Sequence, residues 1–264
     1  MSSPCRVERV LAAVMLAALP LASGMAATPL RLCAEPANLP FADTEGNGFE
    51  VAIVRLLARK LDRPLELVAT VQGPHGFARR TLGEGVCDVL TGMPTGAEGA
   101  LTTRPYYRST WMFVGRAGEP LPASFDDPRL RTWRVAVPVV GEGWDTPPVA
   151  ALGRRGIVAN LRRFPLGTKQ PTGPLDAVAK GEADLAIVWG PVAGWYAGRS
   201  PVPLTLAPTP AMDGDVTFTG GASFAVRRDD GRLREALDAA LREEREGVSA
   251  ILAAWRVPPA EQGE

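Results

Sequence analysis

The fold is constrained most strongly by an alternation of strand-like and helical segments that occurs twice along the chain. Apolar runs typical of buried strands, such as LRLCAE at 30–35, are followed by runs such as FEVAIVRLLARKL at 49–61, whose apolar residues recur at helical spacing. The pattern restarts with RVAVPVV at 134–140 and reaches DLAIVWG at 184–190. Strands that alternate with helices form mostly parallel sheets flanked by helices. The sequence therefore predicts an α/β protein of two lobes, completed by one long amphipathic helix at 232–255.

The N-terminal residues have the order of a secretory signal peptide. Arg6 and Arg9 precede an apolar run of about 13 residues, and the small residues SGMAA end at residue 27. A membrane span needs roughly 20 apolar residues, so a retained membrane helix is the weaker alternative. We expect residues 1–27 to be removed on export and the remaining chain to be periplasmic, without membrane insertion.

Composition argues against several classes of protein. Lys and Arg total 29 and Asp and Glu total 29, so the formal net charge is zero, unlike that of a nucleic-acid-binding protein. His75 is the one histidine, and without a Cys/His cluster we expect neither a metal site nor a cofactor. Cys33 and Cys87 remain after signal removal, and an even pair in an oxidising compartment favours a disulfide over a metal site or a nucleophile.

Several segments resemble a known family. In chain order they are LRLCAEPANLPF, GFEVAIVRLLA, TLGEGVCDVLTGMP, LTTRPYYRSTWMFV, TPPVAALGRRGI, GEADLAIVWGPVAGWY and FAVRRDD. Together they resemble the type II periplasmic solute-binding fold. More narrowly, LTTRPYYRST and IVWGP are similar to the solute-binding-like proteins encoded with periplasmic quinoprotein methanol and alcohol dehydrogenases, the MoxJ/XoxJ type. The resemblance covers essentially the whole chain after the signal peptide.

The resemblance implies a discontinuous first lobe. Lobe 1 is expected to comprise residues 28–115 and 221–264, and lobe 2 residues 116–220, with hinge crossings at the two ends of lobe 2. Each lobe is expected to contain a mostly parallel sheet flanked by helices. The strands LRLCAE and CDVLTG would then be neighbours, which brings Cys33 close to Cys87.

A binding cleft is expected at the carboxyl ends of the strands, where open parallel sheets bind their ligands. Compared with amino-acid-binding relatives, TGAEGALTT lacks the arginine that clamps a carboxylate, and Trp189 replaces an aspartate that holds an ammonium group. We therefore expect an apolar or aromatic ligand, or a partner's side chain. Arg104 and Arg108 flank the tyrosine pair, and either could meet a carboxylate. The alternatives are that the aromatic residues only pack between the lobes and that these arginines form surface ion pairs. The candidate cleft residues are Glu35, Asn38, Phe41, Met93, Thr95, Tyr106, Tyr107, Arg108, Glu142, Trp144, Trp189 and Trp195.

Three functions follow from these observations. The first, implied by the resemblance, is a non-catalytic accessory protein that binds a PQQ-dependent methanol or alcohol dehydrogenase or its cytochrome c partner. The second is the substrate-binding component of an ABC importer for a small apolar or aromatic solute. The third is a small periplasmic lyase in which Glu35 and Glu142 act as an acid–base pair. His75 has no serine or cysteine motif beside it and is expected to be a loop or helix-start residue rather than a general base.

Overall fold

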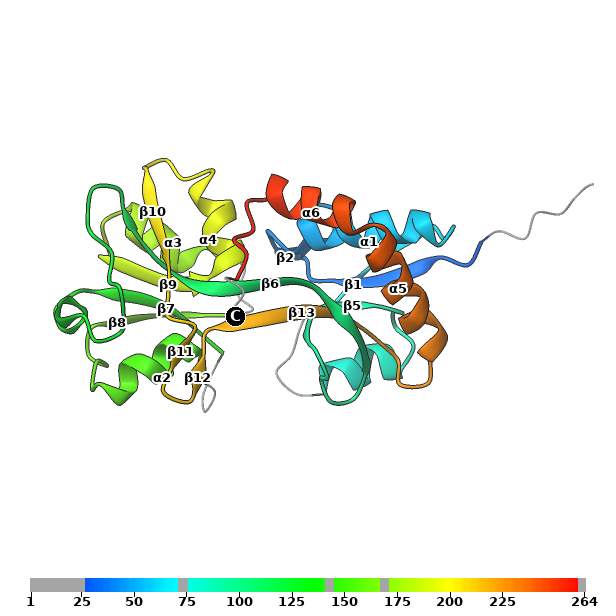
Figure 1. Cartoon of the computed structure of the whole chain (residues 1–264), viewed down its shortest axis with the longest axis horizontal. Helices are drawn as coiled ribbons and strands as arrows, with labels where there is room; N and C mark the ends of the chain where they lie inside the picture. Colours follow the sequence, from blue (N-terminus) through cyan, green and yellow to red (C-terminus); the bar gives the residue numbers. More distant parts are fainter. Residues whose placement is uncertain (1–26, 71–75, 141–144, 167–170, 261–264) are drawn as a thin grey trace, which may run out of the picture.

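The computed structural model describes residues 27–70, 76–140, 145–166 and 171–260 of the 264-residue chain. Two α/β lobes lie side by side, and two long strands run through both, as Figure 1 shows. These strands are β6 (Leu101–Arg116) and β13 (Thr219–Val226). The predicted signal peptide lies almost wholly in residues 1–26, outside the described residues. Within the described ranges, no helix is long and apolar enough to cross a membrane.

The first lobe contains the N-terminal and C-terminal parts of the chain. Strand β1 pairs in parallel with β4, and a parallel bridge from Leu32 to Val89 links β1 to the residue before β5. Strand β13 lies antiparallel between β5 and β6. The remaining elements are β1 (Leu30–Ala34), β2 (Ala37–Asn38), β3 (Ala42–Asp43), α1 (Phe49–Lys60), β4 (Leu65–Ala69), the π-helical turn η1 (Arg79–Gly83), β5 (Leu90–Pro94), α5 (Gly231–Glu243) and α6 (Arg245–Ala254).

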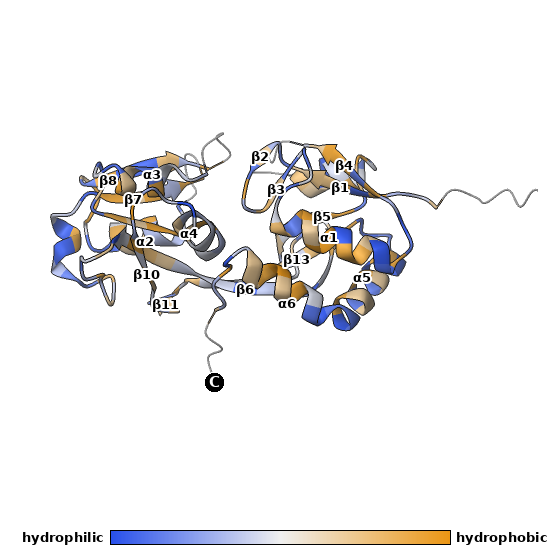
Figure 2. Ribbon diagram, turned by 90° about the horizontal axis from the view of Figure 1, so that it is seen from above, coloured by the Kyte–Doolittle hydropathy of each residue, from blue (hydrophilic) through white to orange (hydrophobic). Residues whose placement is uncertain are grey.

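The second lobe contains the middle of the chain. Strand β7 pairs in parallel with β8 and β9, and β6 runs antiparallel to both β9 and β10. Figure 2 shows hydrophobic residues along β7, inside this lobe. Its elements are the 3-10 turn η2 (Pro128–Arg131), β7 (Val135–Val139), α2 (Pro147–Arg154), β8 (Leu161–Pro165), α3 (Gly173–Ala179), β9 (Leu185–Trp189), α4 (Gly190–Ala197), β10 (Leu204–Pro208), β11 (Met212–Asp213) and β12 (Val216–Thr217).

The two lobes are joined through an exchange of partners along β6. This strand pairs with β13 from Leu101 to Thr110 and with β9 from Trp111 to Val114. One strand therefore belongs to both sheets, and because it runs antiparallel to its neighbours, each sheet is mixed. The lobe boundaries predicted at 115/116 and 220/221 both lie within these crossing strands.

Helix α1 positions the loop that carries Phe41, a residue that lines the cleft between the lobes. The helix buries Ile53, Val54 and Leu57 in the core of the first lobe, as their helical spacing predicts. It starts after Gly48, which has a φ of 113°. A Cβ atom at Gly48 would lie 2.2 Å from the carbonyl oxygen of Phe41, so only glycine permits this approach. The loop that carries Phe41 is thereby held against the start of α1.

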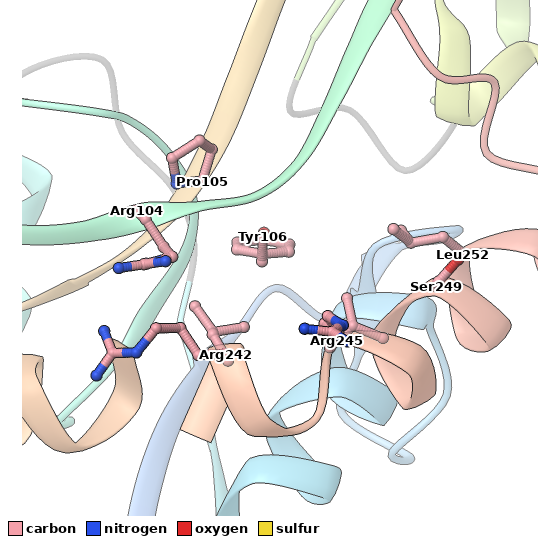
Figure 3. A pocket seen from close by; sticks show the side chains of 9 residues that line it. Arg104, Pro105, Tyr106, Arg242, Arg245, Ser249 and Leu252 are labelled. Carbon is pink, nitrogen blue, oxygen red and sulfur yellow. The ribbon is translucent and has the colours of Figure 1, made fainter. Parts of the chain in front are cut away.

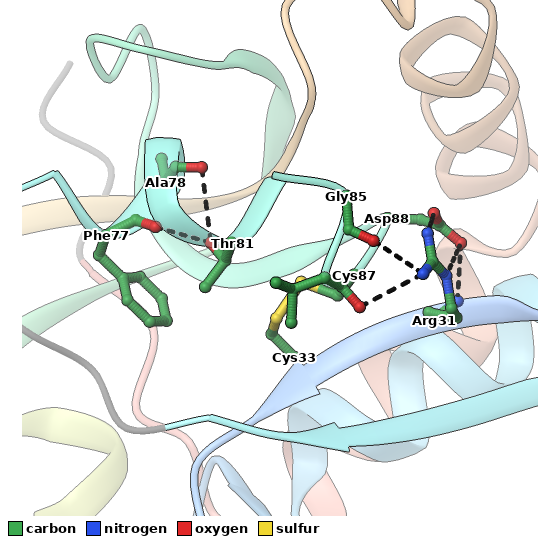
Figure 4. The surroundings of a disulfide bond; sticks show 9 residues. Arg31, Cys33, Phe77, Ala78, Thr81, Gly85, Cys87 and Asp88 are labelled. Carbon is green, nitrogen blue, oxygen red and sulfur yellow. Dashed lines mark hydrogen bonds and ion pairs between the residues drawn. A yellow bond between two sulfur atoms is a disulfide. The ribbon is translucent and has the colours of Figure 1, made fainter. Parts of the chain in front are cut away.

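The predicted disulfide is confirmed. Cys33 of β1 and Cys87, just before β5, are bonded with their Cα atoms 5.6 Å apart (Figure 4). Arg31 lies beside the bond, donating to Asp88 Oδ1 at 2.7 Å and to the Gly85 carbonyl oxygen at 2.8 Å. The two strands are therefore neighbours, as the expected sheet order requires, and an ion pair ties them together next to the disulfide.

The single helix predicted at 232–255 is wrong, because the structure divides it into α5 and α6 at Glu244. Helix α5 buries Leu237 and Leu241 against β6 and β13, whereas α6 packs on α1. The approach of α6 to α1 is close: a Cβ atom at Gly247 would lie 2.8 Å from Leu56 Cδ2. The change of direction at Glu244 lets one apolar stripe cover two differently oriented surfaces.

After α6 the chain returns to the second lobe. Ser109 Oγ of β6 donates to the Pro258 carbonyl oxygen at 2.6 Å, and the Ala260 amide donates to the Arg108 carbonyl oxygen at 3.2 Å. A Cβ atom at Gly194 of α4 would lie 1.9 Å from the Arg256 carbonyl oxygen, so α4 is in backbone contact with this segment. Residues 255–260 are therefore a third connection between the lobes, visible as the red segment beyond α6 in Figure 1.

Candidate functional site

Side chains from both lobes enclose a cavity at the carboxyl ends of β1 and β9. Glu35 follows β1, Asn38 and Phe41 come from the β2–β3 turn, Tyr107 from β6 and Trp189 from the end of β9. This inner cavity has a volume of about 210 Å³. Its other lining residues are Cys33, Ala42, Glu50, Thr91 and Gly92. Five of the predicted cleft residues thus surround one cavity.

A second cavity of about 290 Å³ adjoins the first, because Asn38, Phe41 and Trp189 line both. We call it the aromatic cavity, and we call the two cavities together the interlobe cleft. Apart from Asn38 and Phe41, the walls come from the second lobe: Trp111, Pro138, Leu166, Pro171, Val188, Trp189 and Val192. These side chains carry no formal charge, so the aromatic cavity is suited to an apolar occupant.

Trp189 lies at the junction of the two cavities. Its indole nitrogen Nε1 donates to the Tyr107 hydroxyl at 3.4 Å, and its ring meets that of Trp111 edge-on with centroids 6.0 Å apart. The side chain is half-buried, so part of the ring remains accessible. Strand β9 ends at this residue, and Pro191 in the first turn of α4 fixes the chain direction just beyond it.

The most perturbed acid of the cleft is Glu50, which sequence reasoning missed. Its side chain is buried beneath the inner cavity, where its Oε1 accepts a hydrogen bond from the Tyr106 hydroxyl. That hydroxyl also accepts from the Gly92 amide at 2.9 Å. Burial raises the pKa of Glu50 to about 7, and hydrogen bonds with Thr91 and Tyr106 partly offset the rise. An acid in the first helical turn normally complements the helix dipole at the surface, so no sequence signal distinguished this one.

Glu35 is also perturbed, because partial burial raises the pKa of its carboxyl group. No arginine lines either cavity among the described residues, so nothing there clamps a carboxylate. The described ranges also hold no cluster of His, Cys, Asp and Glu that could bind a metal ion. The cleft therefore offers aromatic surface, the buried Glu50 and the half-buried Glu35 rather than paired charges.

The other predicted cleft residues lie elsewhere. Met93 and Thr95 lie at the end of β5, where Thr95 Oγ1 shares a 2.8 Å hydrogen bond with Ser223 Oγ. Tyr106 is buried, with its hydroxyl below the inner cavity. Arg108 is exposed.

Trp195 lines a third cavity of about 330 Å³ beside the β2–β3 turn, which shares Pro171 with the aromatic cavity. Its indole N–H is buried without a hydrogen-bond partner in the described part of the chain. Glu142, Trp144 and His75 lie outside the described residues. The predicted acid–base pair of Glu35 and Glu142 therefore stays a prediction.

A two-lobe α/β fold with two crossing strands and a cleft at the strand ends is that of a type II periplasmic binding protein. Known proteins agree with this class, although no protein-family model matches the sequence. The chain is 32% identical to protein MoxJ of Paracoccus denitrificans over 92% of its own length and 94% of that protein. The chain belongs to the MoxJ family.

Solved structures support the same assignment. The periplasmic binding protein XoxJ from Methylobacterium extorquens AM1 superposes with a TM-score of 0.72 at 29% identity, covering 88% of this chain and all of that one. An ancestral cationic amino acid solute-binding protein superposes with a TM-score of 0.68 at 19% identity, covering 86% of this chain and 95% of that one. The second similarity shows the fold alone. The predicted fold class and family are therefore confirmed.

Proposed function

We propose that this protein is a periplasmic, non-catalytic accessory of a PQQ-dependent methanol or alcohol dehydrogenase, which it serves by binding the dehydrogenase or its cytochrome c partner. The observation that carries the proposal is the uncharged aromatic cavity, which is lined by Trp189, the residue that the resemblance places where amino-acid-binding relatives have an aspartate. Membership of the MoxJ family supplies the dehydrogenase system, and the disulfide is in keeping with an exported protein.

The aromatic cavity has the chemistry of a protein-contact pocket. Trp111 and Trp189 form its aromatic walls, and Phe41 brings the first lobe into the same surface. Tryptophan is enriched among the residues that contribute most to protein interfaces, where its ring is desolvated in a packed pocket. An apolar side chain of a partner's loop or helix would complete the packing of these rings.

The third connection between the lobes also favours a docking surface. Receptors that capture a solute close two lobes around it by rotation at the crossing strands. Here residues 255–260 add contacts to β6 and to α4, including the close approach of Arg256 to Gly194. Any closure must move or deform this segment, whereas a partner can bind the lobes as they stand.

A binding experiment with a matched tryptophan control tests the proposal. Trp189→Ala should weaken association with the dehydrogenase or the cytochrome roughly 30-fold, since an aromatic anchor contributes about 2 kcal/mol. Trp133→Ala serves as control: this tryptophan lies outside the cleft, beneath the Arg129 guanidinium at 4.6 Å. Retrieval from periplasmic extract and titration with the purified partner provide the measurement, and circular dichroism checks folding.

Two outcomes would contradict the proposal. Wild-type protein that retrieves neither dehydrogenase nor cytochrome, together with full dehydrogenase activity in a deletion strain, would exclude the accessory role. Equal binding by the wild-type and Trp189→Ala proteins would keep the partnership but remove the cleft from it.

The substrate-binding component of an importer is the second candidate. The observation that favours it is the pair of adjoining cavities, of about 210 and 290 Å³, which suit a small apolar solute. Adjacent permease and ATPase genes, with calorimetric binding of such a solute, would select it over the accessory role. A lyase would need a second catalytic group beside Glu35; Glu50 lines the same cavity, but its Oε1 already accepts the hydrogen bond of the Tyr106 hydroxyl.

A further inference from the structure

A separate cavity of about 550 Å³ lies on the first lobe, between β6 and the bend that joins α5 to α6 (Figure 3). It shares no lining residue with the interlobe cleft. Arg104 and Tyr106 of β6 form one wall, and Arg242 and Arg245 lie on either side of the helix break at Glu244. We call this cavity the arginine pocket.

Three guanidinium groups line the arginine pocket, and its lining includes no carboxylate. Arg104 has one acidic neighbour, Asp238, with Nε 3.6 Å from Oδ1, and Asp238 also pairs with Arg234 at 3.2 Å. Arg242 and Arg245 form no ion pair or hydrogen bond with any described residue. Arg245 is moreover the first residue of α6, where the helix dipole disfavours a cation. The pocket lining therefore carries three positive charges and no negative charge. The nearby acids are Asp238, which pairs with Arg104, and Glu243, whose carboxyl group interacts electrostatically with Arg242.

The floor of the arginine pocket is apolar. The Tyr106 ring, 6% exposed, lies with Leu241, Val248 and Leu252, and Ser249 adds a hydroxyl. Figure 3 shows Arg104 and Arg242 on one side of Tyr106, and Leu252 and Ser249 on the other. Arg245 lies beside Ser249, so guanidinium groups border the apolar floor on both sides of Tyr106. Charged groups and apolar surface are thus adjacent in one pocket, as they are within an organic acid.

We propose that the arginine pocket binds a small organic acid whose carboxylate is attached to an apolar or aromatic body. Arginine forks hold carboxylates through paired, charge-assisted hydrogen bonds. The body of the acid would then cover Tyr106 and Leu252, and the pocket volume lies within the usual range for small-molecule sites. This site is independent of the interlobe cleft and of the accessory role proposed for it.

The test uses 3-phenylpropionate as probe and 3-phenylpropanamide as its uncharged analogue. We expect the acid to bind the full mature chain with a dissociation constant on the order of 1 mM, and the amide at least 10-fold more weakly. Arg242→Gln and Arg245→Gln should each weaken acid binding about 10-fold. Arg232→Gln is the matched control, because Arg232 is exposed on α5 and lies outside the pocket. Calorimetry and NMR titration provide the measurements.

Further arms separate this site from a general anion patch and from the cleft. Trp189→Ala should leave binding of the acid unchanged, and added salt should weaken it because the guanidinium groups are exposed. Inorganic phosphate should bind more weakly than the acid, since it cannot use the apolar floor. Equal binding of acid and amide, equal binding of acid and phosphate, no effect of the Arg242→Gln and Arg245→Gln substitutions, or no binding of the acid at about 10 mM would each overturn the proposal.

Discussion

The interlobe cleft and the arginine pocket differ in charge, in exposure and in the number of lobes that form them, although neighbouring residues of one strand contribute to both. Tyr107 lines the cleft, and its neighbour Tyr106 lines the pocket. The cleft combines side chains of two lobes, is aromatic, and holds its buried acid Glu50 beneath the floor. The arginine pocket belongs to one lobe and has exposed cations above an apolar floor. This chain has the cleft of a solute-binding fold, and the arginines that could bind a carboxylate lie on another surface.

Electrostatics explains why the two regions should respond differently to solvent. Charges at an open rim are hydrated and screened by salt, so the arginine pocket should be salt-sensitive. A charge in the buried cleft floor must instead be neutralised or paired, and burial accordingly raises the pKa of Glu50. The Tyr106 hydroxyl, which bonds Glu50, connects the two regions physically.

Loss of the disulfide should have the largest effect and should separate the two regions most clearly. Replacing Cys33 and Cys87 by serine removes a crosslink between residues 54 positions apart, which should lower the free energy of unfolding by about 4 kcal/mol. Cys33 also lines the inner cavity, so cleft binding should weaken more than binding of 3-phenylpropionate. Urea unfolding with and without reductant measures the stability, and the double variant should be insensitive to reductant. A wild-type stability that reductant leaves unchanged would contradict this expectation.

The next largest expected effect is a fall in the free energy of unfolding with rising pH, which depends on the pKa of Glu50. Its folded-state pKa, about 7, is above the ordinary glutamate value of 4.5. The folded protein therefore keeps a proton that the unfolded chain releases, and this contribution to stability is fully present below pH 4.5 and lost as the pH rises towards 7. The loss should approach about 3 kcal/mol. Glu50→Gln should remove this decline, whereas Glu84→Gln, at an exposed turn, should preserve it. Unfolding curves between pH 4 and 8 measure the difference, and identical profiles for Glu50→Gln and wild type would rule out a buried neutral acid.

Sequence reasoning predicted the parts of this molecule that depend on pattern and missed those that depend on exact packing. The repeated alternation of strands and helices predicted the fold class, and the cysteine count predicted the disulfide. The rule that open parallel sheets bind ligands at the carboxyl ends of their strands predicted a cleft with Glu35, Asn38, Phe41, Tyr107 and Trp189 among its residues. The structure brings all five around the inner cavity. Whether these residues bind a partner stays a prediction.

The arginine pocket and Glu50 were not predictable in this way. Arg104 and Arg242 are far apart in sequence and face one cavity because α5 packs on β6. Arg245 and the first turns of α6 line the same cavity after the bend at Glu244. An unbroken helix was predicted there, since the apolar stripe continues through the bend. Glu50 is buried because α1 is held against the Phe41 loop by the backbone approach at Gly48, which no residue pattern reports.

The smallest expected effect is the response to ordinary amino acids, for which neither region is suited. L-phenylalanine differs from 3-phenylpropionate by one ammonium group, which in the arginine pocket would lie close to three guanidinium groups and be repelled. In the interlobe cleft its carboxylate would find no arginine among the described lining residues. We expect no heat of binding from any common amino acid up to roughly millimolar concentration, whereas 3-phenylpropionate should titrate under the same conditions. Micromolar binding of an amino acid, abolished by Trp189→Ala and unaffected by Arg242→Gln, would identify the cleft as a solute site after all and return the importer component to first place.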